Sequence, residues 1–206
     1  MARLERAALC DLFLDLGPDQ PTLCEGWTTR DLAAHLVTRE RRPDAAIGIL
    51  VKPLRGHTER IRSATARLPY ADLVAALRRP PFWSMSGFGP LDRATNTLEF
   101  FIHHEDVRRA QPDWAPRQLD GRTTRALWQA VRGVARLNLR RFQAPVELVA
   151  PGQGQARVGT GEPAVRLSAD PGELVLFLSG RQRAARVELT GPEELTAKLR
   201  TAKLGL

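Results

Sequence analysis

Cysteine is scarce in this sequence. Only Cys10 and Cys24 occur among 206 residues, which is too few for a disulfide framework, and their spacing is not that of paired metal ligands. Free cysteine usually behaves as a small, largely buried apolar side chain. We therefore expect two reduced, half-buried thiols. The hydrophobic share of 43% is enough for an ordinary apolar core in a chain of this length.

Long apolar stretches are missing as well. No run of about 18 or more apolar residues is present, so no membrane-spanning helix and no membrane partner are expected. The first ten residues carry charges at Arg3, Glu5 and Arg6, inside what would be the apolar part of a signal peptide. We interpret them as the start of the first helix of a cytoplasmic protein. Internal repeats and low-complexity tracts are also absent.

Positive charge is abundant, but it is not concentrated. The formal net charge is +8 and the pI is about 10.8, a balance that attracts anions. The arginines lie in scattered pairs, and no aromatic-interleaved basic cluster or known nucleic-acid motif accompanies them. A nucleic-acid partner is therefore not expected. The arginines are interpreted as a solvated surface, or in some cases as residues that hold an anionic substrate.

Apolar residues recur at helical spacing in four long segments. These segments are residues 3–16, 31–38, 91–110 and 123–142. Thr28, followed three residues later by Asp31, has the form of a capping box and predicts the start of the second helix. Two shorter helices, a continuation of the second helix and a Gly-rich connection are expected over residues 57–67, 70–79, 45–50 and 82–90. Four long helices predict a helical bundle over residues 1–142.

The composition changes at Pro145. Short segments that alternate with period two and are separated by Gly-rich turns predict strands, over residues 146–150, 156–159, 164–168 and 185–190. Two short helices are expected over residues 171–179 and 192–200, the first capped by Gly180. Residues 145–206 are thus predicted to form a small α/β module. The predicted fold class of the whole chain is α+β.

The segment Thr97–Ala110 suggests a metal site. Glu99 and His103 are four residues apart, so on a helix their side chains lie on one face. The surrounding residues are apolar, and a buried carboxylate there needs a positive partner, which a divalent cation would supply. Helical bundles gather ligands from facing helices, and His35 lies on the inward face of the second helix. His35, Glu99 and His103 would leave a coordination position open, as in catalytic zinc sites or non-haem iron sites. A satisfied core histidine is the alternative for His35, and His57 is then the reserve ligand.

Other polar residues could support these ligands. Asp31 and Asp106 lie one turn from His35 and His103, so each could accept the non-coordinating imidazole N–H and fix its tautomer. Simple helix capping is the alternative for Asp31. His104 is rotated by about 100° from His103, and we expect it and Glu105 to lie outside the ligand shell or on the surface.

Two stretches together resemble a known family. Gly26-Trp-Thr-Thr-Arg-Asp-Leu-Ala-Ala-His35 and Glu99-Phe-Phe-Ile-His103-His-Glu-Asp106 are similar to motifs of the mycothiol-dependent maleylpyruvate isomerase family, within the wider DinB-like group of metal-binding four-helix bundles. The form of the second stretch resembles an uncharacterised actinobacterial branch. The resemblance implies that His35, Glu99 and His103 are metal ligands. It also implies a C-terminal domain similar to the family's sterol-carrier-like module.

The resemblance implies an enzyme that uses a low-molecular-weight thiol. We expect a thiol transferase or thiol-assisted isomerase acting on a small electrophile, with a divalent cation, zinc in first place and nickel or iron as alternatives. Metal coordination favours the nucleophilic thiolate. Four arginines are candidates for holding anionic groups of the thiol or substrate: Arg39, Arg42, Arg108 and Arg181. The alternatives are a hydrolase with Glu105 or Asp106 as general base, and a non-catalytic module that binds metal or anions. The protein is expected to be a monomer or homodimer.

Overall fold

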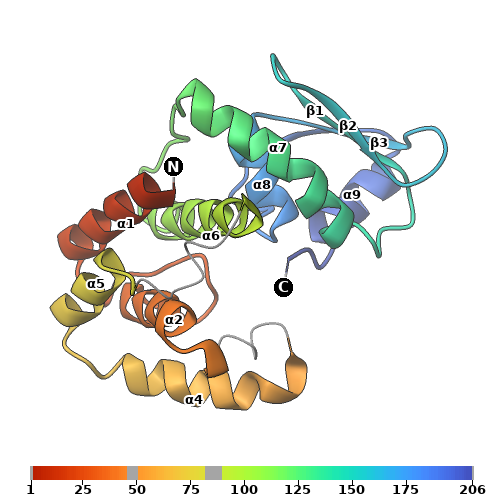
Figure 1. Cartoon of the computed structure of the whole chain (residues 1–206). Coiled ribbons are helices and arrows are strands. Elements are labelled where there is room, and N and C mark those ends of the chain that lie inside the picture. Colours follow the sequence, from red (N-terminus) through yellow and green to blue (C-terminus); the bar gives the residue numbers. More distant parts are fainter. Residues whose placement is uncertain (1, 46–50, 82–89, 206) are drawn as a thin grey trace. The chain divides into compact units, whose positions relative to one another are not determined.

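The chain forms two compact units, Met1–Ala115 and Pro116–Leu206 (Figure 1). The computed structural model describes residues 2–45, 51–81 and 90–205, and of Lys52 and residues 90–95 it describes only the backbone. Most of the predicted helix continuation over residues 45–50 and of the Gly-rich connection over residues 82–90 lies outside these ranges. Helix and strand together confirm a mixed α+β fold with a small sheet.

The first unit is helical. Its elements are α1 (Ala2–Leu16), α2 (Thr29–Arg41), the 3₁₀ helix η1 (Lys52–Leu54), α4 (Arg55–Thr65), α5 (Tyr70–Arg78) and α6 (Pro90–Arg108). Apolar side chains from α1, α2, α5 and α6 form one continuous buried core, including Phe13, Leu36, Leu77 and Phe100. Among the described residues, no helix is long and apolar enough to cross a membrane.

The predicted start of α2 is confirmed. Thr28 is its N-cap, the Thr28 side chain accepts a hydrogen bond from the Asp31 backbone N–H, and the Asp31 carboxylate accepts one from the Thr28 backbone N–H. Arg62 of α4 donates to the same carboxylate at 2.6 Å. The cap therefore also joins α2 to α4.

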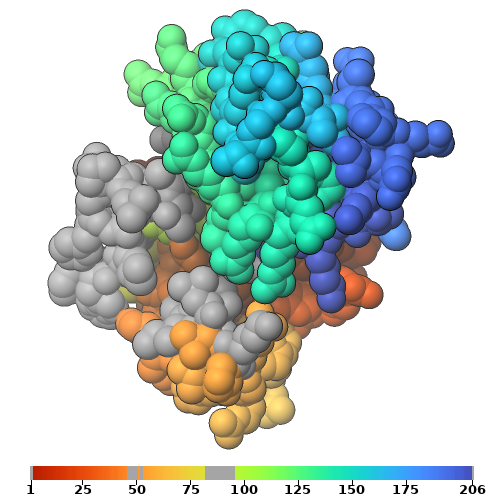
Figure 2. All heavy atoms as spheres, turned by 90° about the vertical axis from the view of Figure 1, so that its right-hand side faces the viewer, coloured from red at the N-terminus to blue at the C-terminus, as the bar shows by residue number. Residues whose placement is uncertain are grey.

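The second unit contains a four-stranded sheet and three helices. The helices are α7 (Gly121–Asn138), α8 (Pro171–Leu178) and α9 (Glu193–Thr201), and the strands are β1 (Val146–Ala150), β2 (Gly154–Val158), β3 (Val165–Ser168) and β4 (Glu188–Thr190). The strand order is β2-β1-β3-β4. β1 pairs antiparallel with β2 and parallel with β3, and β3 pairs antiparallel with β4. Figure 2 shows this unit in green to blue, as a continuous mass of atoms.

Helix α7 lies in the second unit, whereas the predicted division placed it in a bundle over residues 1–142 and began the second domain at residue 145. The reason lies in its contacts. α7 packs against α8 and β2, its buried face contains Leu127, Val131 and Ala135, and Asn138 donates to the Leu178 carbonyl at 2.9 Å. Every residue of α8 is buried, so this short apolar helix requires a cover, which α7 supplies within its own unit.

Buried charges on α1 tie the first unit together. The Arg6 guanidinium forms an ion pair with Glu40 of α2, with both side chains almost fully buried, and donates to the Leu77 carbonyl of α5 at 2.9 Å. The same guanidinium lies 4.2 Å from the centre of the Phe100 ring of α6. The neighbouring Glu5 carboxylate lies 2.8 Å from His104 Nδ1, also on α6. Two consecutive residues thus fix α2, α5 and α6 relative to α1.

We expect Arg6→Met to lower the free energy of unfolding by about 3–5 kcal/mol, because it leaves the Glu40 carboxylate buried without its partner. Arg78→Met is the matched control: its ion pair with Asp11 is largely exposed, so the loss there should stay within about 1 kcal/mol. Urea unfolding of the full chain measures both. Equal losses for the two variants would contradict the role given to Arg6.

The Asp31 cap predicts a pH-dependent contribution to stability. Burial alone would raise the pKa of the Asp31 carboxyl, but hydrogen bonds from Thr28 and Arg62 outweigh burial and lower it below its ordinary value. A lowered folded-state pKa stabilises the fold above the unfolded pKa of about 3.9, and this contribution is lost as the pH falls through the folded value. Asp31→Asn should therefore lower the free energy of unfolding by about 1–2 kcal/mol at pH 7, and by clearly less near pH 3.

The control for this experiment is Glu25→Gln, which changes an exposed carboxylate in the loop before α2. It should alter stability little at either pH. Urea unfolding at both pH values checks the pair. A deficit in Asp31→Asn that is as large at pH 3 as at pH 7 would show that the carboxylate charge is not what stabilises the cap.

Candidate metal centre

Three predicted ligands converge between α2 and α6 in the first unit. His35 Nε2 on α2 lies 3.5 Å from Glu99 Oε1 on α6, and His103 Nε2 lies 3.3 Å from the same oxygen. The two imidazole rings meet edge to face, with centroids 5.4 Å apart. One donor atom from each residue lies within 4.8 Å of the other two. Helical spacing aligns Glu99 with His103, and the crossing of α2 brings His35 opposite them.

The three side chains are mostly, but not completely, buried. Their exposed fractions are 14% for His35, 25% for Glu99 and 11% for His103. The Trp27 ring lies 5.1 Å from the His35 ring and covers one side of it. The predicted loop before α2 therefore delivers its large aromatic residue to the wall of the site. The remaining exposure, largest at Glu99, leaves these side chains in partial contact with solvent.

Arg39 places a guanidinium at the site. Its Nε lies 3.4 Å from Glu99 Oε1, and its Nη1 donates to Asn96 Oδ1 at 2.9 Å. Arg39 follows His35 by one turn of α2, so the same helix face presents an imidazole and then a guanidinium to α6. Of the four arginines predicted to hold anionic groups, Arg39 is the one for which these contacts show a position beside the three donors.

The local charges act on one another. Burial alone would raise the pKa of the Glu99 carboxyl, but hydrogen bonds from His103 and His35 outweigh it and hold that pKa well below its ordinary value. Burial lowers the pKa of His35. Burial also opposes the charged form of His103, but hydrogen bonds to Asp106, Cys24 and Glu99 raise its pKa well above the usual value. The site therefore holds an anionic carboxylate between one neutral imidazole and one that readily carries a proton.

The second nitrogen of His103 faces a different set of groups. Nδ1 lies 2.9 Å from Asp106 Oδ2, so its N–H donates to that carboxylate, whose residue is fully buried. Cys24 Sγ donates to the same oxygen at 3.3 Å and lies 4.0 Å from Nδ1. The backbone N–H of Leu23 donates to the Asp106 carbonyl at 3.0 Å, which fixes this loop on α6. Asp106 thus has the position expected of a carboxylate that orients His103.

Asp31 does not have the corresponding position beside His35. Its carboxylate bonds to Thr28 and Arg62, and no hydrogen bond joins it to His35 in the described part of the chain. The capping alternative is what the structure shows. The reason is local: at the third position of a helix, the carboxylate turns back toward the orphan N–H of the N-cap residue.

His104 and Glu105 are both buried, so of the two alternatives expected for them the surface position is wrong, whereas the position outside the ligand shell agrees with their contacts. His104 pairs with Glu5 on α1. Glu105 Oε1 accepts from Arg108 at 3.0 Å, and Glu105 Oε2 accepts from Arg109 at 2.6 Å. Buried charges require partners, and these residues find theirs in the first unit, away from the three donors.

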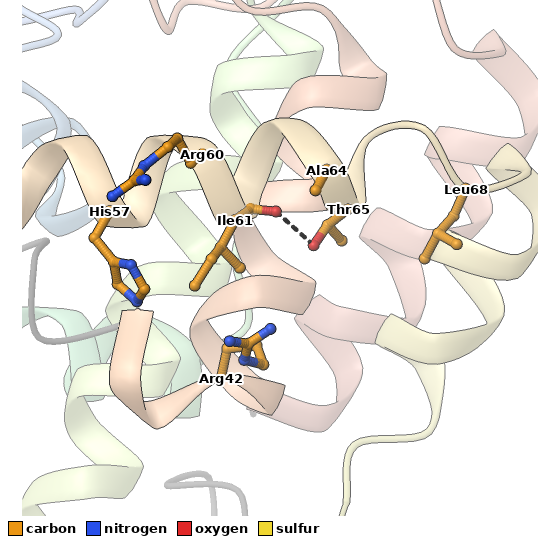
Figure 3. Close-up of a pocket in the computed structure, with 7 residues that line it drawn as sticks. All are labelled: Arg42, His57, Arg60, Ile61, Ala64, Thr65 and Leu68. Atoms are coloured by element: carbon orange, nitrogen blue, oxygen red, sulfur yellow. Dashed lines mark hydrogen bonds between the residues drawn. The ribbon is translucent and has the colours of Figure 1, made fainter.

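The remaining predicted residues lie elsewhere. Arg42 pairs with Asp44 at 2.8 Å in an exposed position, and Arg181 donates to the Ser179 carbonyl in the second unit. His57, the reserve ligand, lies 3.4 Å from Asp44. His57 and Arg42 line an open hollow of about 480 Å³ along α4, together with Arg60, Ile61, Ala64, Thr65 and Leu68 (Figure 3).

Sequence reasoning missed Cys24 as a neighbour of the site. Its position before Trp27 in the loop gave no periodic signal. Hydrogen bonds from Leu23 to the Asp106 carbonyl and from Gln111 to the Pro21 carbonyl hold the loop near the end of α6. It also missed Glu5 and Arg6, whose charges were used only against a signal peptide. The signal that could have identified them is their place in the sequence, since both lie next to apolar residues that face the core from the first helix.

Comparisons with known proteins follow this geometry. Residues 2–80 match the family model described as the mycothiol maleylpyruvate isomerase N-terminal domain. This range contains His35, whereas Glu99 and His103 lie beyond it. A search of curated protein sequences gives no match.

Two solved structures share the fold. They are the crystal structure of the mycothiol-dependent maleylpyruvate isomerase, at 16% identity, and that of a histidine-to-alanine mutant of the isomerase, at 14% identity. Each alignment has a TM-score of 0.52 and covers 92% of this chain and 90% of the other. At these identities the likeness shows the fold alone. Together with the sequence match it confirms the predicted resemblance: residues 2–80 of this chain are similar to the mycothiol maleylpyruvate isomerase N-terminal domain.

Proposed function

We propose that this protein is a thiol-dependent isomerase or transferase that acts on a small electrophile and holds a divalent cation with His35, Glu99 and His103. The observation that carries the proposal is the spacing of the three donors. Two imidazole nitrogens flank one carboxylate oxygen at 3.5 and 3.3 Å. The match of residues 2–80 to a mycothiol isomerase domain supplies the class of reaction.

The donor spacing fits a tetrahedral cation. Zinc binds imidazole nitrogen and carboxylate oxygen at about 2.0–2.2 Å, so ligand atoms around one zinc ion lie about 3.3–3.5 Å apart. The two nitrogen-to-oxygen distances have this value, so the side chains need little rearrangement to share an ion. Two histidines and one carboxylate leave a position for a further ligand. The same set suits nickel or iron, so the donors do not identify the metal.

A cation held there would supply the positive charge that favours the thiolate form of a small thiol over the protonated form. The protein's residues perform the remaining tasks. Asp106 accepts the Nδ1–H of His103 and thereby directs Nε2 toward Glu99. Trp27 covers the His35 ring and limits water on that side.

Arg39 supports the choice of an anionic substrate. Its guanidinium lies at the site and is 17% exposed, so a carboxylate of the thiol or of the electrophile could replace Glu99 as its partner. Bidentate pairing with a planar carboxylate is the recognition that arginine performs best. Binding roles for Arg42, Arg108 and Arg181 stay predictions, since each guanidinium has a partner away from the three donors.

The hydrolase alternative has less support. It needs a general base that faces the open position. Both oxygens of Glu105 bond to arginines, and Asp106 faces Nδ1 of His103, the nitrogen on the other side of the ring from Glu99. A non-catalytic metal-binding module requires no such base. The activity experiment below distinguishes this alternative from an enzyme.

Several finer predictions accompany the proposal. They are a cytoplasmic location, a monomer or homodimer, and no nucleic-acid partner. In fold terms they are a DinB-like helical bundle for the first unit and a sterol-carrier-like module within the second, with the division at residues 115–116 in place of the predicted one at residues 142–145.

Elemental analysis tests the three ligands. We expect His35→Ala to bind one fewer equivalent of divalent metal per chain than the unaltered protein, because one imidazole and the α2 side of the site are lost. His57→Ala is the control, since His57 lies in the α4 hollow and should leave the metal content unchanged. An unchanged metal content in His35→Ala would overturn the ligand assignment.

Activity is tested with the metal-loaded protein, a panel of small thiols including mycothiol, and electrophiles carrying a carboxylate, including maleylpyruvate. We expect thiol- and metal-dependent turnover, together with a fall of at least about 100-fold in kcat/KM for Glu99→Gln. Arg39→Met should mainly raise KM for the carboxylated partner. Stoichiometric metal binding without turnover by any pair would favour the non-catalytic module.

A further inference from the structure

A second set of donors lies on the other side of the His103 ring. Cys24 Sγ, Asp106 and His103 Nδ1 form a cluster in which one donor atom from each residue lies within 4.8 Å of the others. The distances are 3.3 Å from Sγ to Asp106 Oδ2, 4.0 Å from Sγ to Nδ1 and 2.9 Å from Nδ1 to Oδ2. We call these three residues the Cys24 cluster. Nothing in the proposed function uses its thiol.

The Cys24 cluster has nearly the dimensions of a metal site. With zinc–sulfur bonds of about 2.3 Å and zinc–nitrogen or zinc–oxygen bonds of about 2.0–2.2 Å, tetrahedral ligands lie about 3.3–3.5 Å apart. The three distances within the Cys24 cluster, 2.9, 3.3 and 4.0 Å, differ from this ligand-to-ligand separation by about half an ångström or less. Rotation of the Cys24 and Asp106 side chains would suffice, because the Leu23 bond to the Asp106 carbonyl already holds the loop on α6.

We propose that the Cys24 cluster binds a second, thiophilic divalent cation, with His103 as the bridge between two metal positions. Nε2 of His103 faces Glu99, and Nδ1 faces the Cys24 cluster. On binding, the cation replaces the thiol proton and the Nδ1 proton, both of which pass to water. The donors are then a thiolate, a carboxylate and Nδ1 of His103. The His103 ring is a neutral imidazole while Nε2 keeps its proton, and an imidazolate once a cation at the first position replaces that proton too. These donors suit a soft or borderline ion such as zinc or cobalt, and do not suit magnesium or calcium.

Access and charge are consistent with this site. Cys24 is half-buried, in contrast to the fully buried Cys10, so an ion can approach from the side of the loop. The Asp106 side chain is completely buried, and its carboxylate already accepts from His103 Nδ1 and Cys24 Sγ, the two groups that would share the cation with it. The proposal shares His103 with the proposed active site, but it does not depend on any thiol-dependent activity.

Cobalt provides a direct readout, because a cysteine thiolate bound to Co²⁺ gives a charge-transfer band in the near ultraviolet. The whole 206-residue chain is reduced with a phosphine, freed of small thiols and titrated with Co²⁺ alone. We expect two equivalents of Co²⁺ per chain and the thiolate band. Cys24→Ala and Cys24→Ser should lose the band and one equivalent, while the control Cys10→Ala keeps both. Circular dichroism confirms that each variant is folded.

The His35→Ala variant separates the two metal positions. If the Cys24 cluster binds as proposed, this variant keeps the thiolate band with one equivalent of Co²⁺, even if the three-ligand site of the proposed function fails. The absence of the band in the unaltered protein would overturn the proposal, as would a cobalt content in Cys24→Ala equal to that of the unaltered protein. Either result would leave Cys24 as a hydrogen-bond donor to Asp106.

Discussion

The convergence of positive and polar groups on the Glu99 carboxylate is the constraint on which the first unit depends. A carboxylate placed among apolar helix faces is costly unless charge and hydrogen bonds compensate it. Here two imidazoles and the Arg39 guanidinium lie within 3.5 Å of Oε1. Because these groups come from both α2 and α6, the carboxylate also fixes where the two helices meet.

The rest of the first unit maintains that meeting point. Arg6 pairs with Glu40 on α2 and stacks on Phe100 of α6, so one residue of α1 contacts both helices of the candidate site. The capping box and Arg62 fix the start of α2. The same Arg62 lies 5.1 Å from the Trp27 ring, which in turn covers His35. Supporting charges and aromatic contacts of this kind keep ligands in place before any ion binds, and such preorganisation is what a metal site needs.

The His103 ring lies between two different sets of donors, which the sequence pattern alone did not reveal. Its two nitrogens face different donors, Glu99 on one side and Asp106 with Cys24 on the other. In the proposed enzyme the second side orients the ring. If the Cys24 cluster also binds a cation, the same imidazole couples two metal positions, and occupation of one will alter the affinity of the other.

Residues whose roles follow from local spacing could be predicted from the sequence. The four-residue interval places Glu99 and His103 on one helix face, the Thr28–Asp31 pattern marks the start of α2, and period-two alternation marks β1, which has the predicted bounds Val146–Ala150. Whether the three donors bind an ion stays a prediction. Apart from His35, whose meeting with Glu99 and His103 was expected from their chemistry, nonlocal partners such as Glu5 for His104 could not be predicted in this way.

Three features for which the sequence pattern allowed more than one partner illustrate that limit. Asp31 could bond either to His35 or to Thr28 at the start of its own helix, and it bonds to Thr28. His104 depended on a carboxylate on α1, at the other end of the first unit's sequence. Helix α7 has the same amphipathic pattern whether it covers a bundle or α8, so its pattern could not say to which unit it belongs.

X-ray absorption on the zinc-loaded Cys24→Ala variant, before and after a small thiol is added, tests the central claim most directly. Removing Cys24 ensures that any sulfur at the ion comes from the added thiol. The account predicts nitrogen and oxygen neighbours at about 2.0–2.2 Å with the outer-shell pattern of imidazole, followed by one sulfur at about 2.3 Å once the thiol is present. A spectrum without imidazole, or one that gains no sulfur at any thiol concentration, would contradict it.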